Sequence, residues 1–141
     1  MSYRDALAPT SRTPLTYLDS SLALEAVLES PLRTAAVDWL LDRSLVSSRL
    51  LKTEVLRALR RDSKPIDSAN WLFARIGFFI LTNTIHLRAE AIAPHVKSLD
   101  ALHLGTALGI EVPLEIAARD KNLCVVASGL GLTLASLPEE P

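Results

Sequence analysis

Short apolar segments of strand character alternate with helical segments along almost all of this 141-residue sequence. Each strand-like segment is rich in leucine, β-branched or aromatic residues and is bounded by turn-forming residues. These segments are residues 15–19, 45–48, 78–85, 113–118 and 132–137. Strands that are separated by helices pair in parallel, because each helix returns the chain across the sheet. The order of elements therefore predicts an α/β protein of three layers, α/β/α, with a short parallel sheet.

The helical segments have apolar residues at spacings of three and four, and several have recognisable ends. They are residues 22–29, 31–43, 50–62, 67–75, 86–93, 98–110 and 120–130. We expect Ser20 or Ser21 to cap the first helix and Pro31 to open the second. In parallel α/β sheets, functional sites form beyond the carboxyl ends of the strands. Side chains that directly follow a strand-like segment are therefore the first candidates for a site.

The length and composition of the chain suit one domain with a sizeable core. Hydrophobic residues make up 49% of the sequence and charged residues 22%, which excludes global disorder. Residues 1–13 are rich in Ser, Thr, Arg and Pro and show no periodicity. We expect a flexible lead-in over these residues, followed by a domain over residues 14–138.

The cysteine content and the apolar segments favour a cytoplasmic protein. Cys124 is the single cysteine, so the chain cannot form an internal disulfide. The N-terminal residues lack the apolar core of a secretory signal. The longest apolar stretch, residues 71–81, contains Arg75 and is too short to span a bilayer. We therefore expect no association with a membrane.

Two aspartates follow strand-like segments closely. Asp19 ends the first segment, and Asp120 comes two residues after the fourth. Both positions belong to the carboxyl edge of the predicted sheet. Each residue also suits the N-cap of the next helix, since its oxygens accept hydrogen bonds from unpaired N–H groups. Position alone leaves a capping role and a functional role open for both.

Two further acids lie on helices beside apolar residues. Glu54 borders the apolar stripe of its helix, where a carboxylate is costly unless it is paired. A local ion pair with Arg57 or Arg61 is one explanation. Asp100 lies in the first turn of its helix, where the dipole favours an acid, yet it shares a face with the inward-facing Leu104. Both acids thus have an ordinary structural explanation and a second one, in which they face a common site.

The four acids together indicate a cation site at one edge of the sheet. Carboxylates that gather in one place repel one another, and ionising all of them is unfavourable without a cation. Hard oxygen ligands suit Mg²⁺, and Mn²⁺ is a possible substitute. A metal held by several acids can activate a water molecule and stabilise the transition state of a phosphodiester.

Four segments, in this order and at suitable intervals, resemble a PIN domain and especially the VapC-type toxin ribonucleases. They are "YLDSSLALEAVL", "TEVLRALRR", "LRAEAIAPHVKSLDALHLGTAL" and "AARDKNL" with the later "GLGL". The resemblance extends from about Leu15 to Leu137, almost the whole chain. Its most distinctive piece is "SLDALHLGTAL".

The resemblance implies a Mg²⁺-dependent endoribonuclease that is the toxin of a toxin–antitoxin pair. Such a toxin cleaves RNA and is bound and silenced by a small antitoxin protein. The four acids of the family's motifs match Asp19, Glu54, Asp100 and Asp120. The resemblance implies that Asp19 and Asp100 are the principal metal ligands, directly or through water. Glu54 and Asp120 then complete the acid cluster and orient the attacking water.

One departure from the family's pattern keeps a second function open. Ala118 stands where the fourth motif usually has a hydroxyl residue. The alternative is a PIN-like binding or assembly module with little or no nuclease activity.

Other residues near the acids have weaker signals. For His103, a packed or hydrogen-bonded histidine is expected rather than a residue that orients water. The apolar residues 71–81 suggest the surface of a homodimer. A basic run on the helix of Glu54 either guides an RNA backbone or forms a solvated face; it consists of Arg49, Lys52, Arg57, Arg60 and Arg61.

Overall fold

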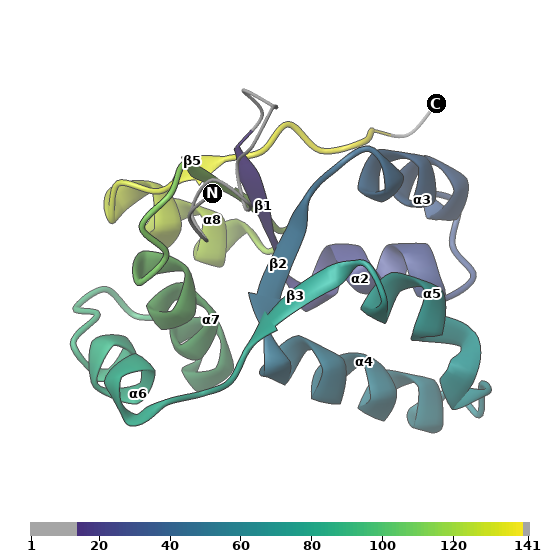
Figure 1. Ribbon diagram of the computed structural model, residues 1–141, viewed down its shortest axis with the longest axis horizontal. Coiled ribbons are helices and arrows are strands. Elements are labelled where there is room, and N and C mark those ends of the chain that lie inside the picture. The colour runs from purple at the N-terminus through teal and green to yellow at the C-terminus, as the bar shows by residue number, and fades with distance from the viewer. Residues whose placement is uncertain (1–13, 140–141) are drawn as a thin grey trace, which may run out of the picture.

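A computed structural model describes residues 14–139 and shows one parallel sheet with helices on both faces (Figure 1). The flexible lead-in that the sequence predicts for residues 1–13 lies outside the described residues. The strands run in the order β3-β2-β1-β4-β5, and every pairing is parallel. They are β1 (Leu15–Leu18), β2 (Leu45–Ser48), β3 (Ile76–Phe79), β4 (Leu114–Ala117) and β5 (Thr133–Leu134). The predicted three-layer α/β/α architecture is confirmed.

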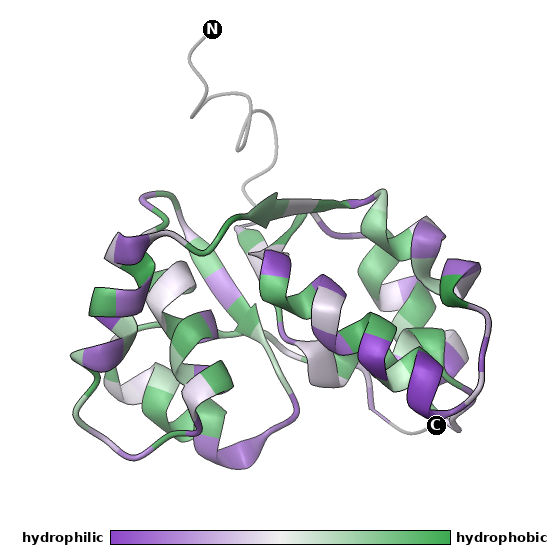
Figure 2. Cartoon of the chain, turned by 90° about the horizontal axis from the view of Figure 1, so that it is seen from below, coloured by the Kyte–Doolittle hydropathy of each residue, from purple (hydrophilic) through white to green (hydrophobic). Residues whose placement is uncertain are grey.

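The helices fall into two groups, one on each side of the sheet (Figure 2). The first group is α2 (Ser20–Val27), α3 (Arg33–Leu41), α4 (Arg49–Arg61), the 3-10 helix η1 (Ile66–Ala69) and α5 (Asn70–Phe73). The second group is α6 (Asn83–Glu90), α7 (Ser98–Leu108) and α8 (Lys121–Gly129). In the described part of the chain, no helix is long and apolar enough to cross a membrane.

The split between the two groups follows from the strand order. The chain moves outward from β1 through β2 to β3, and then returns past β1 to β4 and β5. Crossovers between parallel strands are right-handed, so a reversal of direction moves the following helices to the other face. The reversal lies between β1 and β4. Such a switch point is where open parallel sheets bind ligands, at the carboxyl ends of the strands.

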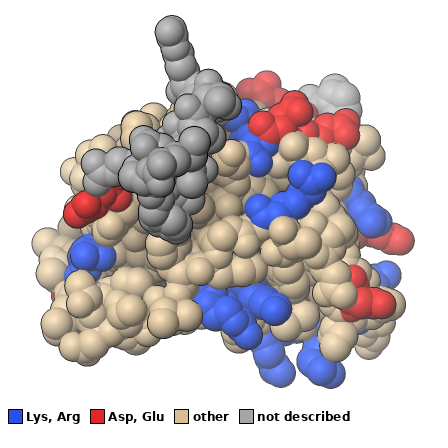
Figure 3. Space-filling model, viewed as in Figure 1, with Lys and Arg blue, Asp and Glu red and all other residues tan. Residues whose placement is uncertain are grey.

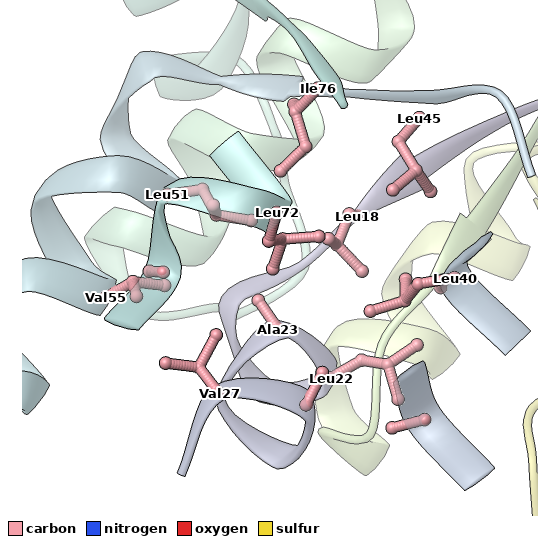
Figure 4. Packing of buried hydrophobic residues seen from close by; sticks show 14 of the residues in the cluster. Leu18, Leu22, Ala23, Val27, Leu40, Leu45, Leu51, Val55, Leu72 and Ile76 are labelled. Carbon is pink, nitrogen blue, oxygen red and sulfur yellow. The ribbon is translucent and has the colours of Figure 1, made fainter. Parts of the chain in front are cut away.

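Each group of helices packs on the sheet through its own apolar cluster. Alternate residues of β1 point to opposite faces, so Leu18 belongs to one cluster and Leu15 and Tyr17 to the other. Figure 4 shows the cluster beneath the first group; it includes Leu18, Leu22, Leu40, Leu45, Leu51, Val55, Leu72 and Ile76. The second cluster includes Leu15, Tyr17, Val46, Leu104, Ile116 and Leu123. The two clusters hold β1 and β4 fixed between them.

The chain turns from the third strand into a helix earlier than the sequence predicts. The predicted strand over 78–85 is wrong beyond Phe79, because β3 spans Ile76–Phe79 and α6 begins at Asn83. The Thr82 hydroxyl accepts the backbone N–H of Ile85 at 3.2 Å and so caps α6. The β-branched residues of this stretch favoured a strand, but the cap and the packing of α6 against α7 decide its conformation.

Candidate active site

The carboxyl ends of β1 and β4 meet at one edge of the sheet. The backbone N–H of Asp19, directly after β1, donates to the Ala117 carbonyl of β4 at 2.9 Å. A pocket of about 430 Å³ lies at this edge, which we call the acidic pocket. It is lined by Asp19, Glu54, Asp100 and Asp120 together with Ser20, Ser21, Leu24, Lys97, Ser98 and Leu99. The structure thus brings the four acids that the sequence singles out to one pocket.

Asp19 is buried, with 4% of its surface exposed, and it caps α2. Its Oδ2 accepts the backbone N–H of Ser21 at 3.2 Å and the Ser21 hydroxyl at 2.7 Å. The prediction that Ser20 or Ser21 caps this helix is therefore wrong, since the carboxylate one position earlier takes the unpaired N–H group. The capping contacts use one carboxylate oxygen, and Asp19 Oδ1 lies 4.0 Å from Nε2 of His103. Asp19 can therefore cap α2 through Oδ2 and still present Oδ1 to the acidic pocket.

Glu54 reaches the acidic pocket from α4, and its partners lie far away in the sequence. Its Oε1 lies 2.6 Å from His103 Nε2, and its Oε2 accepts the Ser20 hydroxyl at 3.2 Å. The ion pairs between described residues include none between Glu54 and either Arg57 or Arg61. The local pairing that the helical spacing allowed is replaced by contacts with the two helices that border the pocket.

His103 is buried and hydrogen-bonded at both ring nitrogens, as the sequence predicts. Its Nδ1 lies 2.8 Å from the hydroxyl oxygen of Tyr17, and the two rings meet edge to face. The same hydroxyl accepts the backbone N–H of Ser48 at 3.2 Å. Burial raises the pKa of Tyr17 far above its usual range. Tyr17 was missed in the sequence analysis. The feature that could have indicated it is a side chain with a hydroxyl group in a buried strand, two residues before Asp19.

Asp100 and Asp120 complete the acidic pocket from α7 and α8. Burial raises the pKa of Asp100, and the nearby carboxylates of Asp19 and Asp120 raise it further. Asp120 caps α8, with its Oδ1 accepting the Leu123 N–H at 2.8 Å. Ala118, at the position of the family's hydroxyl residue, is buried in the apolar cluster beneath α8. Asp120 is thus oriented by its own helix rather than by a side chain at position 118.

The donors around the acidic pocket suit a hard divalent cation. Carboxylate and hydroxyl oxygens are the ligands that Mg²⁺ prefers. The upward shift in the pKa of Asp100, caused partly by its acidic neighbours, indicates repulsion that a cation would relieve. Within residues 14–139, no three His, Cys, Asp or Glu side chains are close enough together to form a metal centre by themselves. The four acids fit a cation because they all line one pocket, and water molecules would complete the coordination of a bound ion.

Two further lining residues were missed by sequence reasoning, although they lie close to Asp100 in the chain. Lys97 precedes α7 as its N-cap residue, and Leu99 is 47% exposed. Lys97 brings a positive charge to a pocket of carboxylates, and Leu99 brings an exposed apolar surface. The positive charge suits a phosphate group, and the apolar surface suits an attached base.

A second pocket of about 610 Å³, which we call the α4 pocket, adjoins the acidic pocket. The two pockets share Ser20, Leu24, Glu54 and Leu99. The other residues that line the α4 pocket all come from α4: Leu50, Thr53, Arg57, Ala58 and Arg61. Basic side chains gather at the lower edge of the molecule in Figure 3, where α4 lies. Positive charge therefore flanks the acidic pocket on one side.

Comparison with known proteins places this architecture in a family. The PIN domain model matches residues 16–129. Ribonuclease VapC35 of Mycobacterium tuberculosis is 30% identical over 128 residues, and the match covers 85% of this chain and 95% of that protein. The same protein in strain H37Rv matches equally.

Two solved structures share the fold at lower sequence identity. A toxin–antitoxin complex from Klebsiella pneumoniae superposes with a TM-score of 0.62 at 16% identity, over 74% of this chain and 86% of that one. VapBC2 from Rickettsia felis, bound to a DNA fragment from its promoter, has a TM-score of 0.65 at 10% identity, over 87% of this chain and 98% of that one. The chain therefore belongs to the PIN domain family and is a homologue of the VapC ribonucleases.

Proposed function

We propose that this protein is a Mg²⁺-dependent endoribonuclease and the toxin of a toxin–antitoxin pair. The observation that carries the proposal is the meeting of Asp19, Glu54, Asp100 and Asp120 at one pocket, in a homologue of a ribonuclease. The pocket lies at the switch point of a parallel sheet, where phosphate-bearing ligands commonly bind. Its charge requires a cation before a phosphodiester can approach.

The four acids take different roles in this proposal. Asp19 and Asp100 are the principal metal ligands, directly or through water, and Mn²⁺ can replace Mg²⁺. When bound, the metal stabilises charge on the phosphodiester and makes water a better nucleophile. Glu54 is held by two hydrogen bonds and accepts a proton from the attacking water. Asp120, held by its capping bond, completes the acid cluster.

The α4 pocket supplies the path for the RNA strand. It adjoins the acidic pocket and shares four lining residues with it. Arg57 and Arg61 offer charge to phosphates, and Leu24, Leu50 and Leu99 offer apolar surface to a base. A single strand that lies along α4 would therefore place a phosphodiester at the acids.

A PIN-like binding or assembly module is the second candidate. Ala118, in place of a hydroxyl residue, is the feature that favours it. This candidate predicts that RNA or a partner binds without being cleaved.

The partner in this proposal is a small antitoxin that covers the acidic pocket. An arginine suits this pocket, because a guanidinium is permanently charged and forms forked hydrogen bonds with carboxylates. The solved complexes of similar fold contain a toxin and an antitoxin, which supports such a partner. We further propose a cytoplasmic location and a homodimer formed through the exposed part of residues 71–81, which includes Ile80 but not the buried Leu72 and Ile76.

A cleavage assay on single-stranded RNA tests the proposed function. Cleavage should require Mg²⁺, stop with EDTA and return when Mg²⁺ is added back. Glu54→Gln should reduce the rate by about two or more orders of magnitude, as expected for loss of a general base. Asp38→Asn is the matched control, because Asp38 is exposed on α3 and does not line the acidic pocket. RNA binding without cleavage under all of these conditions would favour the binding module.

A further inference from the structure

A line of hydrogen bonds runs from the sheet through α7 to α4 and ends at Glu54. The Ser48 N–H donates to the Tyr17 hydroxyl, which lies 2.8 Å from His103 Nδ1. On the far side of the ring, His103 Nε2 lies 2.6 Å from Glu54 Oε1. Tyr17 and His103 are each 1% exposed, so water does not compete for their polar atoms. The line connects helices from opposite faces of the sheet and reaches the acidic pocket at Glu54.

The three groups form a consistent set of hydrogen bonds when His103 is neutral and Glu54 is ionised. An ionised carboxylate can only accept, so in this set Nε2 of His103 carries the proton that faces Glu54. In the neutral imidazole the other nitrogen, Nδ1, then has a lone pair and accepts the Tyr17 O–H. Burial keeps the pKa of Tyr17 far above its usual range, so the phenol remains a donor. Glu54 and Tyr17 therefore favour the same tautomer of His103, the one that donates to Glu54 and accepts from Tyr17.

We propose that Tyr17 and His103 are positioning residues that hold the Glu54 carboxylate in one orientation at the acidic pocket. The role of Glu54 itself rests on the proposed function, but the positioning does not. A glutamate on a helix has a long, rotatable side chain that would otherwise sample several rotamers. His103 holds Oε1 and Ser20 holds Oε2. A carboxylate has about four acceptor sites, so acceptor capacity remains for a ligand.

A purely structural role for the histidine makes a different prediction. If His103 only fills space and satisfies its own nitrogens, its replacement costs stability and leaves the chemistry of Glu54 unchanged. If it positions Glu54, the donor at the place of Nε2 is what matters. Two substitutions separate these cases, because the glutamine amide nitrogen stands near the position of Nε2 and the asparagine amide nitrogen near that of Nδ1.

The experiment compares Tyr17→Phe, His103→Gln and His103→Asn with wild type by imidazole nitrogen NMR and by kcat and KM on single-stranded RNA. In the wild type, the His103 signals should report a protonated Nε2 and an unprotonated Nδ1. Tyr17→Phe removes the partner of Nδ1, so the other tautomer or the doubly protonated ring should become populated. We expect kcat to fall by about tenfold to a hundredfold in Tyr17→Phe and His103→Asn, with KM almost unchanged, since misplacing a reacting group costs about that much. His103→Gln should recover most of kcat.

Each outcome has a separate meaning. A wild-type His103 protonated at Nδ1, or proportions of the ring's protonation forms that are the same in Tyr17→Phe, would overturn the proposal whether or not the protein cleaves RNA. Equal losses of kcat in His103→Gln and His103→Asn, in step with their loss of thermal stability, would also overturn it. A wild type that fails to cleave while His103 shows the expected tautomer would refute the proposed function and leave the positioning intact.

Discussion

The Ser21 hydroxyl lies 2.7 Å from Oδ2 of Asp19 and accepts the backbone N–H of Arg119 at 3.0 Å. One side chain thus ties the acid after β1 to the turn after β4, on either side of the switch point of the sheet. Ala118 stands where the family usually has a hydroxyl residue. The Ser21 hydroxyl lies at the same edge of the sheet, beside Arg119. The geometry of the acidic pocket therefore depends on a residue of α2.

Replacing Ser21 with alanine should destabilise the protein more than its partial exposure suggests. The substitution removes one partner of the buried Asp19 carboxylate, which costs about 1–3 kcal/mol, and it also removes the hydrogen bond to the backbone N–H of Arg119. Urea denaturation measures this loss. Ser30→Ala is the control, because the Ser30 hydroxyl donates to a single backbone carbonyl, that of Glu25. Equal losses in the two variants would show that the Ser21 link has no special weight.

Asp100→Asn should stabilise the protein in the absence of metal, increasingly as the pH rises. In the folded state the pKa of Asp100 is raised, first by burial and then by Asp19 and Asp120, so folding favours its protonated form. Wild-type stability from this group is therefore greatest below the ordinary aspartate pKa of about 4 and is lost as the pH rises through the higher folded value. Asparagine removes that loss.

The measurement is the free energy of unfolding between about pH 4 and 7 in EDTA, since this range begins at the ordinary aspartate pKa. The gap between Asp100→Asn and wild type should widen with pH, and Mg²⁺ should stabilise wild type more than the variant. Asp38→Asn provides the reference for an exposed acid. A gap that stays constant with pH, together with equal stabilisation by Mg²⁺, would contradict both the repulsion and the assignment of Asp100 as a ligand.

Arg57→Ala should weaken RNA binding and make it less sensitive to salt. If Arg57 contacts one phosphate, the slope of log affinity against log salt should fall by about 0.7, the value for single strands. Binding is measured in EDTA, so that cleavage does not interfere. Arg75→Ala is the control, since Arg75 lines a different pocket beside Leu15 and Leu45, at the opposite end of the strands. The same slope in both variants would remove α4 from the proposed RNA path.

Charge removal from the acidic pocket should weaken the antitoxin. We expect the double variant Asp19→Asn with Asp100→Asn to bind the candidate antitoxin less tightly, because fewer carboxylates attract its arginine. Rising Mg²⁺ should weaken binding to the wild type by competition for the same pocket. A calorimetric titration measures both effects. Affinity that neither treatment changes would mean that the partner docks elsewhere and leaves the acids free.

Gly105→Ala should disturb the packing of α6 against α7. A Cβ at this position would lie 2.9 Å from the Ile85 carbonyl oxygen and 3.1 Å from the Ala89 nitrogen, both of them backbone atoms that yield little. Overpacking of this kind costs about 1–3 kcal/mol, measurable by thermal or urea unfolding. Gly129→Ala is the matched control, because a Cβ there meets no atom within 4 Å. If both variants kept wild-type stability, the two helices would have to be free to separate.

Much of the fold could be predicted from the sequence because its signals are local. The strand at 45–48 coincides with β2, and 15–19 contains β1, since short apolar runs between turn formers leave few alternatives. The prediction for 78–85 was wrong because it also relied on local signals. Its composition favours a strand throughout, but the Thr82 cap and contacts with α7 turn its second half into a helix.

The sequence by itself determined that Asp19 and Asp120 lie at the carboxyl edge of the sheet, because Asp19 directly follows a parallel strand and Asp120 comes shortly after another. Only the tertiary structure decided what Glu54 contacts. Helical spacing offered Arg57 or Arg61, yet the partner is His103, 49 residues along the chain. Hydrogen bonds across such a separation depend on how α4 and α7 pack on opposite faces of one sheet, and no local pattern encodes that. The acids could therefore be found by position, whereas the residues that orient them could be found only in three dimensions.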